Sequence, residues 1–366
     1  MVSKHFPPFR GGLEVRVFEI GRWLVARKER VLVLTSREPG TGSKELVEGM
    51  DVRRSRVLFS AFNASFAPGV LLDLLRLDYD VIDLNLPDPA NSVWALLASV
   101  LRGKPMVVTY HADIIKGGLM FLPFSLVYSP IQSLVLRRSR RIMVTSPDYA
   151  QSSQALGRFM DKVVVASSFI DPVKYNTSVD GASVRQKHAL SGKVVLFVGR
   201  LVPYKGVEYL IDAAREIPRA TFIIVGEGPL KESLIRKASG LRNVLFAGKV
   251  DDKELPRYFG ACDVFVLPSI TRQEAFGLVL VEAMACGKPV VSVNFSGMPY
   301  VVGDGGILVN PEDGHALAEA IKRILGEGAL SANLVKKGLK RVRELFSKDV
   351  VCEKIVDVYK SALSRI

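Results

Sequence analysis

The sequence alternates short apolar runs with amphipathic stretches of helical periodicity along almost its whole length. This alternation predicts parallel β-sheets whose strands are connected by helices. Many runs are apolar at every position, which is typical of strands covered on both faces. The runs fall into two series, the first at 31–35, 81–86, 106–110, 141–145 and 163–166 and the second at 194–198, 222–225, 244–247, 264–267, 290–293 and 306–309.

A polar segment without periodicity, residues 171–192, separates the two series, and we interpret it as an interdomain linker. A chain of 366 residues is long enough for two domains of ordinary size. We therefore predict an α/β fold with two Rossmann-like, doubly wound parallel-sheet domains, residues 1–170 and 193–349. The chain from about 313 onward is helical in pattern, and a C-terminal helix at about 350–366 is expected to pack back on the first domain.

Composition narrows the class of protein. Apolar residues make up 48% of the chain, the profile of a folded, soluble protein. The three cysteines are too few and too scattered for a disulfide framework or a zinc site, which favours a reducing, cytoplasmic location. The net charge of +13 is spread over both halves without a nucleic-acid-binding motif, so nucleic acid is not a predicted partner.

Residues 117–136 carry no charge, and an arginine cluster follows them at Arg137, Arg138, Arg140 and Arg141. Prolines, glycines and serines make this segment a poor transmembrane helix. Two interpretations remain open. One is a buried helical hairpin; the other is an interfacial segment that docks residues 117–141 on an anionic membrane surface, peripheral to its inner face.

The start of the chain departs from the usual pattern of a doubly wound domain. In such a domain the first strand is central and leads into a glycine turn, here Gly11-Gly12, and then into a helix. Only Met1–His5 precede the Phe-Pro-Pro segment before that turn. We predict that the first strand is truncated or that the natural start lies upstream of Met1.

The most informative stretch is residues 268–291, where a strand, a loop with Glu274 and a helix follow one another. Glu282 lies on that helix among Leu, Val, Ala and Met residues. A carboxylate in apolar surroundings is costly unless something pairs with it. The hydroxyl groups of a sugar or a ribose are suitable partners, and the free amides at the helix N-terminus suit an anionic group.

The spacing from Glu274 to Glu282, with Ala-Phe-Gly after the first glutamate, resembles glycosyltransferase family 4, the glycosyl transferases group 1. These are retaining enzymes of the GT-B fold, so the resemblance implies that the two Rossmann-like domains face each other across a cleft. The resemblance covers nearly the whole chain and is densest in residues 194–310. It implies that Glu274 holds the hydroxyls of the donor sugar and Glu282 those of the ribose. It also implies donor contacts from Ala275, Phe276, Gly277 and Leu278.

Two cations, Arg200 and Lys205, follow the strand at 194–198. Cations at the carboxyl edge of a parallel sheet predict a phosphate site. In the resembled family this arginine and lysine bind the donor diphosphate and stabilise the departing nucleotide. The glycines at the strand ends, Gly199, Gly226 and Gly228, are expected at the same site, with the last two in a turn beside the nucleotide base.

The first domain offers fewer candidates. The resemblance implies that Gly11 and Gly12 approach the donor phosphates or the acceptor. It also implies that His111 contacts the donor sugar near the reacting carbon, with Asp113 nearby. The chain departs from the family at residues 167–171, where Ser-Ser-Phe-Ile-Asp replaces the usual Pro-Asn-Gly before the interdomain aspartate.

We predict a retaining, hexosyltransferase-type enzyme that transfers a sugar from a nucleotide-diphospho-sugar to a hydroxyl of a lipid-linked, cell-envelope or small-molecule acceptor. We expect no cofactor and no metal ion, because Arg200 and Lys205 supply the positive charge. Asp78-Tyr79-Asp80 matches the metal-binding Asp-x-Asp of another transferase class but lacks its surroundings. The alternatives are a GT-B-fold epimerase or phosphorylase and a catalytically silent nucleotide-sugar-binding paralogue.

Overall fold

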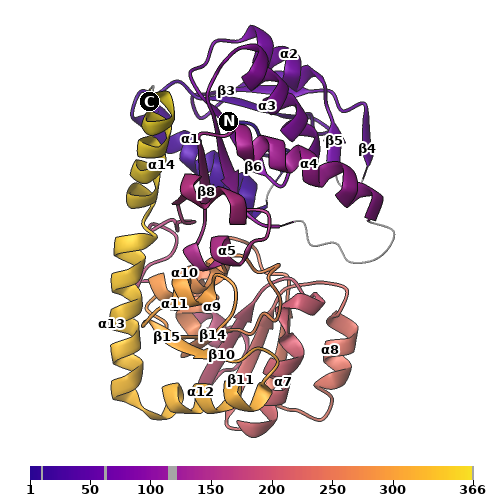
Figure 1. Cartoon of the computed structure of the whole chain (residues 1–366). Helices are drawn as coiled ribbons and strands as arrows, with labels where there is room; N and C mark the ends of the chain where they lie inside the picture. Colours follow the sequence, from indigo (N-terminus) through magenta and orange to yellow (C-terminus); the bar gives the residue numbers. More distant parts are fainter. Residues whose placement is uncertain (10, 62–63, 114–121, 365–366) are drawn as a thin grey trace. The chain divides into compact units, whose positions relative to one another are not determined.

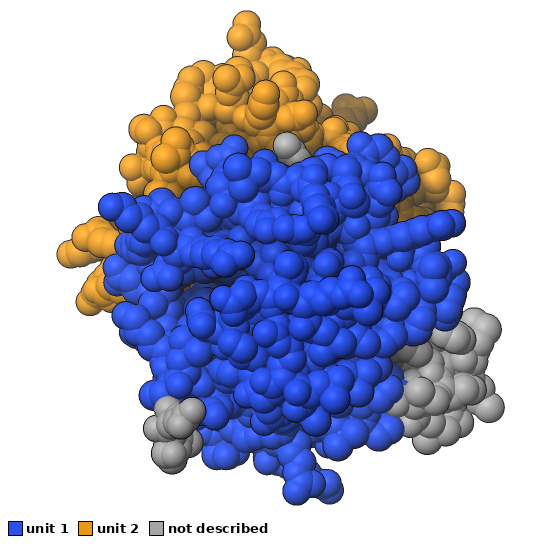
Figure 2. Space-filling model, turned by 90° about the horizontal axis from the view of Figure 1, so that it is seen from above, with its two compact units in different colours: residues 1–145, 150–166, 352–366 blue, residues 146–149, 167–351 orange. Residues whose placement is uncertain are grey.

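The structure is a computed structural model that describes residues 1–9, 11–61, 64–113 and 122–364. The chain divides into two compact units, coloured separately in Figure 2. Unit 1 comprises residues 1–145, 150–166 and 352–366, and unit 2 comprises residues 146–149 and 167–351. Each unit is an α/β body around its own sheet, and each is described by itself below.

Unit 2 contains one parallel sheet with the strand order β12-β11-β10-β13-β14-β15. This is the order of a doubly wound sheet, in which the chain reverses its direction of winding between β10 and β13. All six apolar runs of the second predicted series form these strands. Their bounds are β10 (Lys193–Val198), β11 (Ala220–Val225), β12 (Val244–Gly248), β13 (Val264–Leu267), β14 (Val290–Val293) and β15 (Gly306–Val309).

Burial explains why these runs form strands. Every residue of β13 and β14 is buried, and so are the five apolar residues of β10. Helices cover the sheet and α12 runs beside α7, as Figure 1 shows. The helices in sequence are α6 (Ala182–Lys187), α7 (Val207–Glu216), α8 (Lys231–Lys237), α9 (Leu255–Ala261), α10 (Leu278–Ala285), α11 (Met298–Val302), α12 (Gly314–Gly326) and α13 (Gly328–Leu345).

Unit 1 contains four parallel strands in the order β6-β7-β8-β9, all at predicted positions, and a three-stranded group β1-β3-β2. β3 runs parallel to β1, whereas β2 is antiparallel to β3. β4 and β5 form a separate, two-stranded antiparallel sheet. The bounds are β1 (Leu32–Ser36), β2 (Lys44–Val47), β3 (Met50–Ser55), β4 (Phe59–Ala61), β5 (Ala64–Phe66), β6 (Ile82–Leu86), β7 (Met106–Tyr110), β8 (Arg141–Val144) and β9 (Val163–Val165).

The N-terminal segment joins the two groups of strands in unit 1. Val2 forms a parallel bridge to Leu34 of β1 on one side and to Leu84 of β6 on the other. The Ser3 amide donates a backbone hydrogen bond to the Leu34 carbonyl, and the Ser36 amide donates one to the Lys4 carbonyl, which extends the pairing with β1. The segment therefore takes the central position of the sheet, but as an isolated bridge and not as a five-residue strand.

The helices of unit 1 include the C-terminal part of the chain. Residues 352–366 belong to this unit, and the Tyr359 hydroxyl donates a hydrogen bond of 2.7 Å to Asp83 on β6. Residues 171–192, the expected linker, contain α6 and belong to unit 2. The remaining helices are α1 (Gly12–Ala26), α2 (Gly69–Arg76), α3 (Pro89–Leu101), α4 (Leu122–Arg138), α5 (Pro147–Ser152) and α14 (Lys348–Leu363), of which α5 and α14 each span a boundary between the units in sequence.

The uncharged segment is only partly described. Residues 117–121 lie outside the described residues, and the remainder forms the single helix α4 with Pro130 inside it. A hairpin within residues 122–136 is therefore wrong, because the chain continues as one helix to Arg138. No helix among the described residues is long and apolar enough to cross a membrane.

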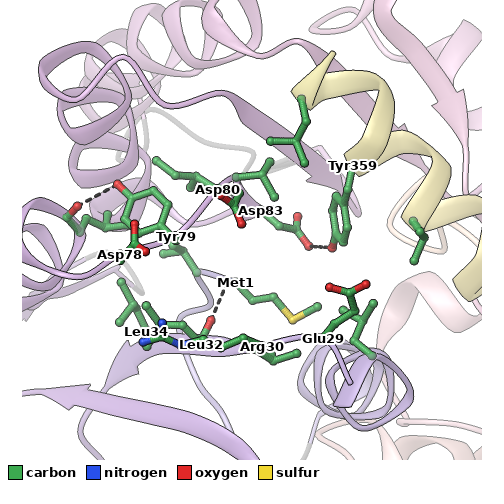
Figure 3. Close-up of a pocket in the computed structure, with 18 of the residues that line it drawn as sticks. Met1, Glu29, Arg30, Leu32, Leu34, Asp78, Tyr79, Asp80, Asp83 and Tyr359 are labelled. Atoms are coloured by element: carbon green, nitrogen blue, oxygen red, sulfur yellow. Dashed lines mark hydrogen bonds between the residues drawn. The ribbon is translucent and has the colours of Figure 1, made fainter. Parts of the chain in front are cut away.

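A cavity of about 270 Å³ opens in unit 1 between β1, β6 and α14. Figure 3 shows Met1 and Leu32 on one side and the Asp83–Tyr359 hydrogen bond on another. Asp78 and Asp80 also line this cavity, whereas none of the predicted donor-site residues does. The cavity lies beside the ends of β1 and β6 at which these strands begin, the edge opposite to the one where His111 follows β7.

Candidate donor site at the second sheet

The reversal point of the sheet in unit 2 brings two loops together. One follows β10 and carries Arg200 and Lys205; the other follows β13 and carries Glu274. The two strands are direct neighbours and run parallel, so their carboxyl ends open at the same edge of the sheet. Ligands of doubly wound sheets bind at this position.

Backbone contacts hold the two loops against each other. The Ile270 amide donates a hydrogen bond of 2.8 Å to the Tyr204 carbonyl. Gly206 has a φ of 61° and precedes α7, and a Cβ at this position would lie 2.2 Å from the Pro268 carbonyl oxygen. Only glycine satisfies both requirements. The sequence Lys205-Gly206 thus fixes how closely the first loop approaches the second.

This approach places the Lys205 ammonium in an ion pair with the Glu274 carboxylate. The Ser269 hydroxyl donates a further hydrogen bond of 3.0 Å to the same carboxylate oxygen. The two side chains of the ion pair are only 10% and 12% exposed. The sequence predicted both residues at the site, and the structure shows that they are direct partners, with Ser269 as a third member.

Arg200 differs from Lys205 in its surroundings. It stands at the end of β10 and is exposed. Among the residues that the structure describes, its guanidinium group has no hydrogen-bond or ion-pair partner. Its five N–H donors are therefore free for an incoming anion, and a planar guanidinium matches the geometry of phosphate oxygens.

The loop after Glu274 presents its backbone toward the same edge. In the described part of the chain, the amides of Ala275, Phe276 and Gly277 donate no hydrogen bond, and Gly277 caps α10 in the left-handed region. The Phe276 ring is turned into the core, where it packs edge-on against Phe346 at 5.6 Å. Any contribution of Phe276 to a ligand must therefore come from its backbone.

The glycine turns at the ends of β10 and β11 pack directly on each other. A Cβ on Gly226 would lie 1.9 Å from the Gly199 carbonyl oxygen, and one on Gly228 would lie 2.3 Å from that of Leu201. The Gly199 and Leu201 amides donate hydrogen bonds to Val225 and Glu227. This close backbone packing is sufficient to explain why glycine occupies positions 226 and 228.

Glu282 lies on α10 and belongs to a separate group of side chains, whose other members come from other segments of unit 2. Its carboxyl group accepts a hydrogen bond from the Tyr175 hydroxyl, and Lys174 and Asp252 lie within electrostatic range. Burial is the main reason why the pKa of Glu282 rises to about 7, and Lys174 opposes the shift. Tyr175 was not predicted from sequence, because the polar segment around it reads as a linker.

The candidates of the first predicted domain lie in unit 1. Gly11 caps α1, and the space around the position of a Gly12 Cβ is open to 4 Å. His111 follows β7 and its Nε2 lies 3.0 Å from Asn85 Oδ1. Burial and the neighbouring Arg16 cation lower the pKa of His111 to about 3, so its imidazole is neutral.

Asp113 takes part in a hydrogen-bond network that sequence did not predict. It accepts hydrogen bonds from the Tyr110 hydroxyl at 2.7 Å and from the Ser153 hydroxyl at 2.6 Å. Gln132 of α4 donates to the Tyr110 hydroxyl at 3.0 Å. The network connects β7, α4 and the end of α5, so Asp113 has a structural role in unit 1.

Asp78 and Asp80 flank Tyr79 just before β6. Both are exposed, and Tyr79 between them donates its hydroxyl to the Leu74 carbonyl. Within the described ranges, the one group of three potential metal ligands is Glu216, His315 and Glu319, all exposed. Lys322 pairs with both Glu216 and Glu319, so an ammonium group already offsets one of their two negative charges.

Comparison with known proteins defines the class. Residues 182–341 match the glycosyl transferases group 1, and residues 11–167 match the glycosyl transferase 4-like domain. The structure of HepE from Anabaena with UDP superposes with a TM-score of 0.80 over 98% of both chains, at 25% identity. The chain therefore belongs to the glycosyl transferases group 1, family 4, and has the GT-B fold.

Two relatives narrow the activity. The chain is 29% identical to the O-antigen chain mannosyltransferase C of Escherichia coli, over 98% of this chain and 96% of the relative. It is 32% identical to the phosphatidyl-myo-inositol mannosyltransferase of Mycobacterium leprae, over 96% and 93%. The protein is a glycosyltransferase that transfers a sugar from a nucleotide sugar, as the sequence predicted.

The buried ion pair gives a stability prediction. Lys205→Met or Glu274→Leu alone leaves one buried charge without its partner. We expect each variant to lower the free energy of unfolding by about 3 kcal/mol, which is at the lower end of the losses measured when one partner of a buried ion pair is removed. The double variant should recover most of this loss, because no charge is left unpaired. Urea unfolding measures all three, and single variants as stable as the wild type would contradict the ion pair.

Proposed function

We propose that the edge of the unit 2 sheet binds a nucleotide-diphospho-sugar and activates its leaving group. Arg200 and Lys205 neutralise the charge that grows on the diphosphate as the glycosidic bond breaks. Glu274 accepts hydrogen bonds from the sugar, and Glu282 accepts them from the ribose. The observation that carries the proposal is the Lys205–Glu274 ion pair at the reversal point, beside the unpaired Arg200.

The electrostatics of this edge suit a leaving diphosphate. Lys205 is held in place by Glu274 before any ligand arrives, so its charge needs no reorganisation during the reaction. The free amides of Ala275–Gly277 and the N-terminal end of α10 add partial positive charge at the same loop. The solved structure of HepE with UDP-glucose shows that a protein of this fold accommodates such a donor.

The neutral His111 and the glycine turn at Gly11-Gly12 belong to unit 1. We assign them to the transferred sugar and to the acceptor side of the reaction, respectively. Retention of the anomeric configuration and independence from metal ions follow from the family resemblance. Both are part of this proposal.

Arg200 provides a test of the leaving-group role, because its loss should leave the fold intact. Arg200→Ala should slow turnover of the nucleotide sugar by about 10²–10³ with an unchanged melting temperature. Arg219 is a matched control, since it is also exposed but precedes β11 at the opposite edge of the sheet. Arg219→Ala should keep wild-type turnover, and equal losses in the two variants would refute a specific role for Arg200.

Glu282 provides a test that depends on pH. The pKa of Glu282 is higher in the folded protein than in the unfolded chain, so protonation of this carboxyl group stabilises the unliganded fold. This stabilisation is complete below the pKa of the unfolded chain and is lost as the pH rises through about 7. Ribose hydroxyls favour the ionised form, so donor binding should release a proton. Donor affinity should then rise between about pH 5 and 7, by up to about tenfold per unit, and level off above.

Calorimetry with a nucleotide-diphospho-sugar measures this dependence, because its diphosphate carries no group that titrates in the same range. The Glu282→Gln variant should bind more weakly and without the dependence. A wild-type affinity that stays constant over the range would show that the ribose does not contact Glu282.

We further propose that the acceptor is lipid-linked and that unit 1 docks on an anionic membrane surface. α3 and α4 pack on each other, and Arg138 of α4 donates a hydrogen bond of 3.0 Å to the Ser99 carbonyl of α3. Exposed apolar side chains stand on both helices, at Leu97, Val100, Leu101 and Leu134. Such side chains beside basic residues are typical of interfacial segments.

The arginine cluster presents fewer free guanidinium donors than its sequence indicates. Arg137 is exposed, whereas Arg140 donates to the Ser364 carbonyl and Arg141 to that of Arg140. The two mannosyltransferase relatives act, by their names, on an O-antigen chain and on phosphatidyl-myo-inositol. A cytoplasmic enzyme held at the membrane by α3 and α4 would meet an acceptor of this class.

Vesicle sedimentation tests this surface. The double variant Val100→Glu, Leu101→Glu should bind vesicles of phosphatidylglycerol and phosphatidylcholine at least about tenfold more weakly than the wild type. Leu46 on β2 is 78% exposed and serves as the control in Leu46→Glu. Equal binding of all three proteins, or equal binding of the wild type to neutral vesicles, would refute the docking surface.

A further inference from the structure

Two polar side chains interrupt the buried strand β6. Asp83 and Asn85 are separated by one residue, so they lie on the same face of the sheet, and they are only 5% and 2% exposed. Polar groups buried this deeply need hydrogen-bond partners. Asp83 has them in the Tyr359 hydroxyl and in the Thr109 hydroxyl, the latter at 3.0 Å. The side-chain amide of Asn85 has two other partners, the Val2 carbonyl and the His111 ring.

The amide of Asn85 can be oriented from its surroundings. Its Nδ2 lies 3.4 Å from the Val2 carbonyl oxygen, which can only accept a hydrogen bond. The nitrogen must therefore face Val2, and the oxygen Oδ1 faces His111. The Nε2 atom of His111 lies 3.0 Å from this oxygen, so Nε2 has to be the donor.

This contact fixes the tautomer of the ring. A neutral imidazole carries one N–H, and with the proton on Nε2 the other nitrogen, Nδ1, has a lone pair. Within the described residues, Nδ1 has no hydrogen-bond partner. Burial and Arg16 keep the ring neutral by lowering its pKa to about 3. His111 can therefore offer an acceptor, but not a charge, to a ligand.

We propose that Asn85 is a positioning residue: it holds His111 in the Nε2–H tautomer so that Nδ1 accepts a hydrogen bond from a hydroxyl of the transferred sugar. The inference rests on the proposed role of His111 at the donor sugar. It adds the direction of the hydrogen bond, and hence the ligand chemistry, which is a hydroxyl donor and not a phosphate oxygen. Asn85 acts only through His111 and touches no substrate.

Nitrogen-15 NMR of the ring nitrogens tests the tautomer on the ligand-free protein, and the His111→Gln variant assigns the signals among the four histidines. In the wild type, His111 should show a protonated Nε2 and an unprotonated Nδ1. Asn85→Leu should abolish this pattern, whereas Asn85→Asp keeps an acceptor and should preserve it. Thr109→Val removes a neighbouring buried hydrogen bond and should leave the His111 signals unchanged.

Nucleotide release from UDP-glucose, GDP-mannose and ADP-glucose gives the second readout. Asn85→Leu should lower kcat/KM of the accepted donor by about 10- to 100-fold, with the affinity for the free nucleotide unchanged and with recovery in Asn85→Asp. A wild-type His111 protonated on Nδ1, or Asn85→Leu with an intact pattern or full activity, would overturn the inference. A wild type that cleaves no donor would overturn the proposed function instead, while the ring signals still decide the tautomer.

Discussion

The structure depends on the close approach of two loops at the point where the unit 2 sheet reverses its winding. Gly206 lets the chain after β10 come within reach of the Pro268 carbonyl, and the Ile270–Tyr204 hydrogen bond holds the loops together. Only then can Lys205 and Glu274 pair at low exposure. The ion pair is costly to desolvate, so it specifies the geometry of the site more than it stabilises the fold.

This arrangement separates the tasks of the charged groups. Lys205 is held in place by its ion pair with Glu274, whereas the Arg200 guanidinium has no partner among the described residues and is free to pair with an incoming anion. Glu282 lies in another group of side chains, where burial raises the pKa of its carboxyl group to about 7. A diphosphate, a sugar and a ribose present one anion and two sets of hydroxyls. Arg200 and Lys205 have the charge to match the anion, and Glu274 and Glu282 have the hydrogen-bonding capacity to match the hydroxyls.

Sequence predicted all six strands of the unit 2 sheet, because each contains a continuously apolar run, and the four inner strands β11, β10, β13 and β14 are buried almost throughout. It missed β3, whose Arg53 and Arg54 break the apolar pattern although Arg54 is buried against Glu45. The candidate donor-site residues were predicted from motifs that resemble family 4, but the pairing of Lys205 with Glu274 was not, because it arises from contacts between distant loops. Asp83 and Asn85 could have been noticed as polar residues alternating in a buried strand; Tyr175 gave no such signal.

The central claim is that the donor binds at the reversal point of the unit 2 sheet. Hydrogen–deuterium exchange with and without the nucleotide-diphospho-sugar that binds most tightly tests it directly, because the Ala275–Gly277 amides make no internal hydrogen bond in the described structure. The account predicts that the donor slows exchange in residues 199–206 and 274–282, and that this protection is lost in Lys205→Met. Protection confined to other parts of the chain, or protection of these segments that survives in Lys205→Met, would contradict it.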